Sequence, residues 1–309
     1  WIGTQGGLFE ARGENFRTYT MKDGLPADTV IGLYRDSKEN LWISTLGGLA
    51  RLSGGKIERM SGQKDFPDTL FVRLNGPANC FEDRTGRLWF STRTQLLAYS
   101  NGVVTRYDKK SVLSDPGINA MHEDASGTVW FATAGGLTSF AGGTFTKYAV
   151  SQNADENTIF VIQEDREGSL WLATGKGIAR FADGMFERFD RTNGLSDNSV
   201  QDLLIDREGS IWVGTNGGGV DRFRDEKFVT YSPKVGLSYD LVTAITEDRT
   251  GAVWIGTSFG GLNRLKDGVI TVFDNKRGTP FQEVRALSED KEGTLWIGAR
   301  GGLYVLKNG

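Results

Sequence analysis

The stretch LWISTLGGL at residues 41–49 recurs along the chain with the same order of apolar, small and glycine residues. Close copies are VWFATAGGL at 129–137, LWLATGKGI at 170–178 and VWIGTSFGGL at 253–262. Each copy holds one tryptophan, and the eight tryptophans of the chain are separated by 41, 47, 41, 41, 41, 42 and 42 residues. A repeat of about 40–45 residues made of several short strands is typical of a propeller blade, so the sequence predicts an all-β propeller.

The repeat that begins at Val200 can be divided into four short strands, A to D. VQDLLID is followed by Asp206-Arg-Glu-Gly209, a turn in which the Asp side chain can bond the backbone and the Gly can adopt a positive φ. SIWVGT, GVDRF and FVTY are the next three strands. The D-x-x-G turn recurs at 83–86, 124–127, 165–168, 248–251 and 290–293. Because no helical period of apolar residues is present, each repeat is expected to form a four-stranded antiparallel blade.

The number of blades follows from counting strands. Complete A–B–C sets begin near seven residues, which are Val30, Pro77, Ile118, Ile159, Val200, Val242 and Val284. The last set ends at Leu306 without a D strand, whereas Phe16 to Tyr19 has the D-strand pattern. We therefore predict a seven-bladed propeller over 14–309, closed by this N-terminal outer strand, which would cover both open sheet edges. Residues 1–13 are then a partial repeat, strands B and C of a preceding blade; the alternative is eight blades with incomplete first and last ones.

Composition excludes several classes of protein. The 309 residues are 38% apolar and 24% charged, which is ordinary for a soluble globular chain with a core. The net charge is −3 and no basic run is present, so nucleic acid is not expected as a partner. No apolar run is long enough for a transmembrane helix. A single cysteine rules out an internal disulfide, and a single histidine, His122, argues against most metal sites and histidine-based triads.

The repeat text resembles a known family. Asp-Gly-Leu-Pro at 23–26, Asn-Gly-Leu-Ser at 193–196, the D-x-x-G-x-[LVI]-W-[IFLV]-x-T pattern and G-G-L look like the two-component regulator propeller repeat. The resemblance implies the periplasmic sensor region of a bacterial membrane-bound signalling protein. It also implies, as partners in the full-length protein, a downstream β-domain and a membrane-linked output domain, either a kinase or a cyclase. The family has no shared catalytic residues, so the resemblance implies a non-catalytic domain without a cofactor.

Residues that recur in every repeat are interpreted as structural. The tryptophans are expected to pack between blades, and the Asp of each D-x-x-G is expected to hold its turn. One Asp per distant blade cannot supply the several converging oxygens of a calcium site, so no metal site is predicted. Cys80 takes the place of larger apolar residues in other A strands and is read as a small core residue.

Loops that differ between repeats are better candidates for function. Since the strands alternate in direction, D–A and B–C loops should share one face, and these loops vary in length and chemistry, notably at 61–76 and 92–95. The predicted ligand-binding residues on this face are Phe66, Arg73, Arg93, Gln95, Lys176, Asn216, Tyr239, Asp240, Phe259, Phe281, Gln282 and Arg300. Aromatic side chains beside polar and charged ones suit a small polar ligand with a ring, such as an oligosaccharide fragment.

Three functions are therefore compared. The first is an extracytoplasmic, non-catalytic propeller that senses a ligand or a neighbouring domain for a signalling receptor. The second is a purely structural interaction module that mediates, for example, a homodimer. The third is an enzyme similar to the streptogramin lyases, which are also propellers; the lone histidine argues against it.

Overall fold

The computed structural model describes residues 1–12, 15–62, 66, 80–92, 95–152, 156–224, 227–274 and 279–307. The chain divides into two compact units, Trp1–Gln152 and Asn153–Gly309, which we call unit 1 and unit 2. Each unit contains four antiparallel sheets. In the described part of the chain, no helix has the length and apolar character needed to span a membrane.

Unit 1 begins with a three-stranded sheet and continues with three four-stranded ones. The first sheet consists of β1 (Ile2–Thr4), β2 (Gly7–Arg12) and β3 (Asn15–Tyr19). The others are β4 (Val30–Arg35), β5 (Leu41–Thr45), β6 (Gly48–Ser53) and β7 (Lys56–Arg59); β8 (Cys80–Glu82), β9 (Leu88–Ser91), β10 (Gln95–Ser100) and β11 (Val103–Asp108); and β12 (Ile118–Glu123), β13 (Val129–Thr133), β14 (Gly136–Ala141) and β15 (Thr144–Tyr148). Two short helical turns, η1 (Met21–Asp23) and α1 (Lys109–Val112), lie in the D–A loops.

Unit 2 has three four-stranded sheets followed by a three-stranded one. They are β16 (Ile159–Glu164), β17 (Leu170–Thr174), β18 (Gly177–Ala182) and β19 (Met185–Phe189); β20 (Val200–Ile205), β21 (Ile211–Thr215), β22 (Val220–Arg224) and β23 (Lys227–Tyr231); β24 (Val242–Glu247), β25 (Val253–Thr257), β26 (Gly261–Lys266) and β27 (Val269–Phe273); and β28 (Val284–Glu289), β29 (Leu295–Ala299) and β30 (Gly302–Leu306). The helical turn η3 (Pro233–Val235) precedes β24.

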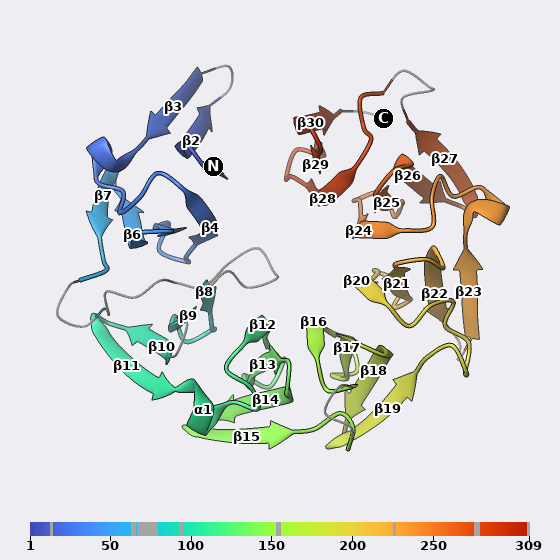
Figure 1. Ribbon diagram of the computed structural model, residues 1–309, viewed down its shortest axis with the longest axis horizontal. Helices are drawn as coiled ribbons and strands as arrows, with labels where there is room; N and C mark the ends of the chain where they lie inside the picture. Colours follow the sequence, from blue (N-terminus) through green and yellow to red (C-terminus); the bar gives the residue numbers. More distant parts are fainter. Residues whose placement is uncertain are drawn as a thin grey trace. The chain divides into compact units, whose positions relative to one another are not determined.

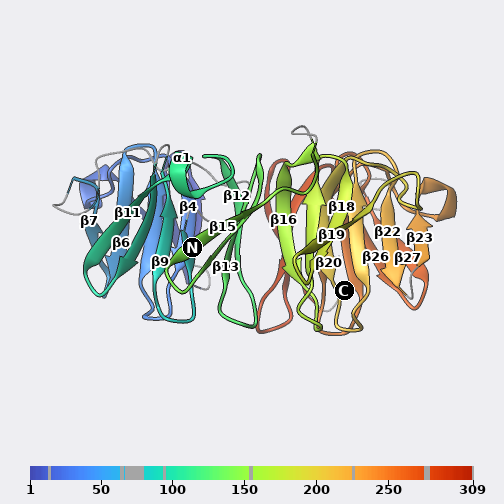
Figure 2. The same cartoon turned by 90° about the horizontal axis from the view of Figure 1, so that it is seen from below.

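Every sheet is a meander in which consecutive strands pair, as expected for a propeller blade. Within unit 2, the first strands β16, β20, β24 and β28 lie on the inner side of their sheets, and β19, β23 and β27 lie on the outer side (Figure 1). Seen from the side, the strands of each unit run between two layers of loops (Figure 2). The prediction of an all-β fold with four-stranded antiparallel blades is confirmed.

The predicted count of seven blades is wrong: the described residues form eight sheets, with three strands in the first and the last, which is the alternative that the sequence left open. Phe16–Tyr19, expected to close the last blade as its outer strand, belongs to β3 and pairs with β2, with Leu8 opposite Tyr19. The last sheet ends at β30, and no described strand pairs with its outer side. Pairing with the strand two residues upstream closes a far smaller loop than pairing with the other end of the chain, so the local partner costs less conformational entropy.

The aspartate and the tryptophan of each repeat are hydrogen-bonded to each other. In the seventh sheet Asp248 Oδ1 accepts the backbone N–H groups of Thr250 and Ala252, while its Oδ2 accepts the indole N–H of Trp254 at 2.8 Å. The same Asp–Trp bond, at 2.7–3.0 Å, joins Asp36 and Trp42, Asp83 and Trp89, Asp124 and Trp130, Asp165 and Trp171, Asp206 and Trp212, and Asp290 and Trp296. The carboxylate therefore accepts hydrogen bonds both from backbone N–H groups of the turn and from the indole N–H. The indole ring is buried in all but the last of these pairs.

Adjacent blades are hydrogen-bonded to each other on the face that carries the D-x-x-G turns. Glu247, at the end of β24, accepts the backbone N–H of Arg207 in the preceding turn at 3.0 Å. Glu289, at the end of β28, accepts the N–H of Arg249 at 2.9 Å in the same way. These arginines also donate to backbone carbonyls of the next turn, those of Asp248 and Asp290. The face that carries the D-x-x-G turns is thus occupied by structural contacts between blades.

Candidate binding site

Within unit 2, the B–C turns and the D–A loops lie together, as the alternation of strand direction predicts. The N–H groups of Asn216, Ser258 and Arg300, in B–C turns, donate to the carbonyls of Ser199, Leu241 and Glu283 in the loops before strand A. The distances are 2.8–3.0 Å. This face carries the variable loops, so the search for a binding site concentrates on it.

Asn263 fixes the loop that runs from η3 to β24. This residue is fully buried on β26, its Oδ1 accepts the N–H of Ser238 at 2.9 Å, and its Nδ2 donates to Ser238 Oγ at 2.8 Å. Thr138 and Asp221 accept the N–H groups of Ser114 and Ser196 in the same way in other blades. The loop at 237–240 is therefore held in place by a buried polar contact.

The neighbouring B–C turn is held equally firmly. Thr257 Oγ1 donates to the carbonyl of Gly261 and accepts the N–H of Gly260, at 3.0 and 3.1 Å. A Cβ at Gly260 would lie 2.4 Å from Ser238 Oγ, so only glycine allows this close approach of the turn to the η3–β24 loop. Phe259 is consequently presented at the tip of a fixed turn.

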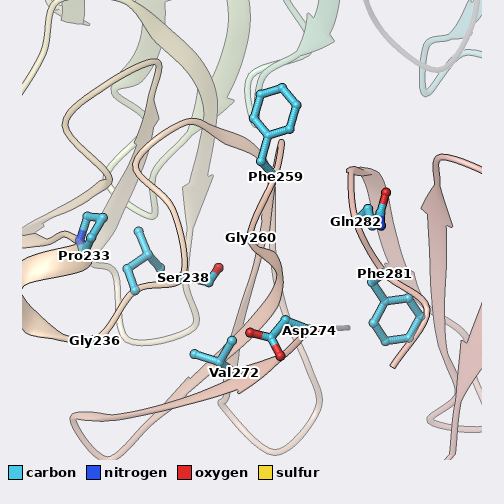
Figure 3. Close-up of a pocket in the computed structure, with 10 residues that line it drawn as sticks. Pro233, Gly236, Ser238, Phe259, Gly260, Val272, Asp274, Phe281 and Gln282 are labelled. Atoms are coloured by element: carbon cyan, nitrogen blue, oxygen red, sulfur yellow. The ribbon is translucent and has the colours of Figure 1, made fainter. Parts of the chain in front are cut away.

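A groove of about 550 Å³ lies between these loops and the loop that leads into β28. It is lined by Pro233, Gly236, Leu237, Ser238, Phe259, Gly260, Val272, Asp274, Phe281 and Gln282. In Figure 3 the Phe259 ring stands at one end, with the Gln282 side chain directed the same way, and the Asp274 carboxylate lies nearer the other end. A volume of about 300–1,000 Å³ with mixed apolar and polar walls is usual for a small-ligand site.

Two aromatic side chains stand exposed beside this groove. Phe259 is 69% exposed and Tyr239 is 37% exposed. Their ring centroids are 5.4 Å apart in an edge-to-face arrangement, so each ring supports the other. Leaving a large apolar ring this far in water has no packing benefit, which makes the pair a candidate contact for a ligand.

The other residues predicted in unit 2 take different positions. Phe281 is only 5% exposed and packs against Tyr304, so it forms a wall of the groove and is also a core residue. Gln282 is exposed on the groove. Asp240 is partly buried and its carbonyl accepts the N–H of Gly219. The remaining three are exposed at B–C turns of separate blades and are not part of the groove lining: Lys176, Asn216 and Arg300.

In unit 1, Phe66 is 4% exposed and packs on Trp42, Phe90 and Tyr99 with ring centroids 5.4–6.4 Å apart. The structure therefore places this predicted ligand contact in the core. Gln95, at the start of β10, is partly buried. Arg73 and Arg93 lie outside the described residues.

Buried ionisable groups lie away from the groove lining. Asp202 on β20 has a pKa raised to about 6 because burial disfavours the carboxylate, although N–H groups of Ile245 and Leu203 donate to it. Burial likewise raises the pKa of Asp221 and that of the Cys80 thiol, whose side chain packs in the core as predicted. Among the described residues, no group of three or more His, Cys, Asp or Glu side chains is arranged to hold a metal ion.

Sequence reasoning missed Pro233, Ser238, Val272 and Asp274. A signal for Pro233 is present in Ser232-Pro-Lys-Val-Gly236, in which a proline at the first position and a left-handed Gly236 with φ 106° enclose a helical turn. Val272 and Asp274 lie at the end of the outer strand β27, where sequence alone gives no reason to expect a cavity wall.

Comparison with protein families agrees with the repeat text. The description "Two component regulator propeller" matches residues 24–47, 154–176, 194–217, 236–259 and 278–301. The chain carries two component regulator propeller repeats. Two of these matched repeats, 236–259 and 278–301, contribute Tyr239, Phe259 and Gln282 to the groove and its rim. A search of curated proteins finds no significant match.

Several solved structures share the fold. One is a chain described as the extracellular domain of a hybrid two component system from B. thetaiotaomicron, with a TM-score of 0.55 and 19% identity, over 99% of this chain and 55% of that one. A virginiamycin B lyase from Staphylococcus aureus, solved in a catalytically inactive form with quinupristin, has a TM-score of 0.60 and 16% identity over 89% and 93% of the two chains. PorZ, a surface component of the type-IX secretion system of Porphyromonas gingivalis, has a TM-score of 0.53 and 19% identity over 98% and 50%. The chain thus spans about half the length of the first and third of these proteins.

Proposed function

We propose that this chain is a non-catalytic binding module of a bacterial signalling receptor, located outside the cytoplasm. The two component regulator propeller repeats and the likeness to an extracellular domain of a hybrid two component system support this assignment. The module binds a small polar ligand and passes the bound state to an output domain elsewhere in the receptor.

The observation that carries the proposal is the exposed Tyr239–Phe259 pair beside the groove of unit 2. The ring faces can stack on a sugar or similar ring, while Gln282 and Ser238 offer hydrogen-bonding groups in the groove. An oligosaccharide fragment matches this combination of apolar faces and polar partners. The loops are held before any ligand arrives, which lowers the entropic cost of binding.

The lyases share the propeller fold at 16% identity, and that likeness concerns fold alone.

The proposed binding of a small polar ligand can be tested directly. We expect one or more members of a panel of oligosaccharide fragments and small polar metabolites to raise the melting temperature of the protein, because a ligand that binds the native state stabilises it.

The test of the site is the variant Phe259→Ala. Because the ring is 69% exposed, we expect the free energy of unfolding of the variant without ligand to stay within about 0.5 kcal/mol of the wild-type value. The affinity for the selected ligand should fall at least tenfold, or about 1.4 kcal/mol, in isothermal titration calorimetry. Phe16→Ala is the matched control, since Phe16 is 68% exposed on β3 and does not line the groove. Equal losses in both variants, or none in Phe259→Ala, would reject the groove as the site.

A further inference from the structure

We propose that the ligand of the unit 2 groove is cationic, a sugar fragment whose ring bears a protonated amine, and that the Asp240 carboxylate and the Tyr239–Phe259 ring pair recognise this charge. The inference rests on the proposed function, because it narrows the class of ligand that the same site binds. Its basis is a change in the loop before β24 that leaves a carboxylate without the partner found in equivalent loops.

The loop before β24 has two counterparts of equal length in the chain. The three loops are TMKDGLPADT at 20–29, DRTNGLSDNS at 190–199 and SPKVGLSYDL at 232–241. In each, the fifth residue is a glycine with a φ of 106–122°, and the sixth is a leucine that is 3–4% exposed. The N–H of this leucine donates to the carbonyl of the first residue at 3.0–3.3 Å. The loops therefore share a local conformation, and residues at equal positions can be compared.

In the first two loops, the side chain of the ninth residue accepts the backbone N–H of the second. Asp28 Oδ1 accepts the N–H of Met21 at 2.7 Å. Asn198 Oδ1 accepts the N–H of Arg191 at 2.8 Å. This hydrogen bond ties the end of the loop to its beginning, so the polar side chain of the ninth residue is used for structure.

The third loop cannot form this bond. Its ninth residue is Asp240 and its second is Pro233, which has no backbone N–H. In the described residues the Asp240 carboxylate forms no hydrogen bond and no ion pair, not even with Lys234 of the same loop. Pro233 lines the groove (Figure 3). A carboxylate directed as in the other two loops would therefore face the groove.

The third loop also lacks a second hydrogen bond of its counterparts. Asp23 Oδ2 accepts the N–H of Thr20 at 2.8 Å, and Asn193 Oδ1 accepts the N–H of Asp190 at 2.6 Å. The residue at the position of Asp23 and Asn193 in the third loop is Val235, which is 59% exposed and precedes a glycine that lines the groove. Two side chains that serve the structure of the other loops are thus replaced or released beside the groove.

The two exposed rings are suited to a cation. Three buried tryptophans of unit 2 each have an arginine guanidinium 5.6–5.9 Å from the ring centroid. In the described part of the chain no such cation lies over Tyr239 or Phe259, although both rings are exposed. A cation beside an aromatic face is attracted by the π electrons of the ring. A ligand amine can therefore take the place that an arginine has over the tryptophans.

The charge of the groove walls agrees with a cationic ligand. None of the described lining residues is basic, and the one charged lining residue is Asp274. In Figure 3 its carboxylate lies nearer the end of the groove opposite the Phe259 ring. A sugar with a carboxylate or sulfate group would meet no described cation in the lining, whereas an amino sugar would meet only neutral and acidic groups.

The test compares two sugars of the same length that differ in charge. In mildly acidic buffer a tetramer of glucosamine carries protonated amines, whereas a tetramer of N-acetylglucosamine is neutral. We expect isothermal titration calorimetry to show at least tenfold tighter binding of the glucosamine tetramer, or about 1.4 kcal/mol. Added salt should weaken the binding of the glucosamine tetramer only, because salt screens interactions between exposed charges.

The variant Asp240→Asn isolates the carboxylate. It keeps the backbone carbonyl that accepts the N–H of Gly219, so we expect an unchanged thermal melt. Its affinity for the glucosamine tetramer should fall at least tenfold, while its affinity for the N-acetylglucosamine tetramer stays within twofold of wild type. Asp267→Asn is the matched control, because it removes the same charge from an exposed C–D turn and should change neither affinity.

Three results would overturn the inference: equal affinity of the wild type for the two tetramers, unchanged affinity of Asp240→Asn for the glucosamine tetramer, or equal losses in Asp240→Asn and Asp267→Asn. The proposed function is tested separately by Phe259→Ala. If that variant loses a neutral sugar while Asp240→Asn binds both tetramers as the wild type does, the groove remains the binding site and the assigned charge is wrong. If no sugar of either kind binds, both proposals are wrong.

Discussion

For single residues, the same amino acid at equivalent positions of two repeats can have very different solvent exposure. Trp171 and Trp296 occupy the same place in their blades and bond the same kind of aspartate, yet they are 4% and 38% exposed. Asp202 is a second example, because the equivalent residues of neighbouring inner strands are Val161, Ala244 and Ala286. The carboxylate there reaches across to the next blade and accepts the N–H of Ile245 at 2.8 Å.

Asp202 should make the stability of the protein depend on pH. Its pKa is about 6 in the folded protein, and the ordinary value of about 3.9 applies when the chain is unfolded. The folded state therefore binds the proton more tightly, so the contribution of this group is fully present below about pH 4 and is lost as the pH rises through 6. We expect a loss on the order of 3 kcal/mol between these limits, since one pKa unit corresponds to about 1.4 kcal/mol.

The variant Asp202→Asn isolates this effect. Urea denaturation at several pH values should show the stability of the variant rising relative to wild type between about pH 4 and pH 7. A constant difference across that range would contradict the raised pKa. Glu247, which contacts the turn of the preceding blade, is a suitable control as Glu247→Gln.

At the scale of elements, the sequence predicted the strands well because they depend on local patterns. The four strands expected after Val200 correspond to β20, β21, β22 and β23, and the turn at Asp206 lies between the first two as expected. The short helices α1 and η3 were missed because one turn of helix leaves almost no period in the sequence. Phe66 and Phe281 were predicted at an exposed surface and are buried, because exposure depends on which other blade residues pack against them.

The buried tryptophans should account for much of the cohesion between blades. Trp171 packs in one cluster with Val200, Leu203 and Val213 of the following blade. We expect Trp171→Ala to destabilise the protein by about 3–5 kcal/mol, as large truncations in a core do. Trp296→Ala, at the exposed equivalent, should cost clearly less, and chemical denaturation of both variants measures the difference. Equal losses would mean that burial between blades does not determine the effect.

At the scale of the whole molecule, local rules could not decide the number of blades. Seven and eight blades use the same strands, and they differ in whether Phe16–Tyr19 pairs with the hairpin partner beside it or with the last blade. The hairpin partner is favoured because its short loop costs less conformational entropy to close, and a strand pattern by itself does not weigh the two closures against each other. The same limit applies to the candidate site: the sequence identified the variable face, Tyr239, Phe259 and Gln282, whereas Asp274 and Val272 join the groove through the path of β27.

The corrected pairing predicts the result of a truncation. Removing residues 1–12 takes away β1 and β2, and β2 is the strand with which β3 pairs. The hydrogen bond from Tyr19 Oη to Glu10 at 3.0 Å is lost as well. The amides of Asn15–Tyr19 should then exchange with solvent much faster than in the full chain. Unchanged protection of these amides in the truncated protein would indicate pairing with another sheet, as the seven-bladed closure requires.

We propose that the ligand binds to the loop face of unit 2 and not to the face of D-x-x-G turns. Hydrogen exchange with and without the best ligand of the panel tests this most directly. We predict slower exchange at 235–241, 257–261 and 281–284, with no change in the C–D turns such as 266–269. Protection confined to those turns or to the D-x-x-G turns, with the groove segments unaffected, would place the ligand on the opposite face.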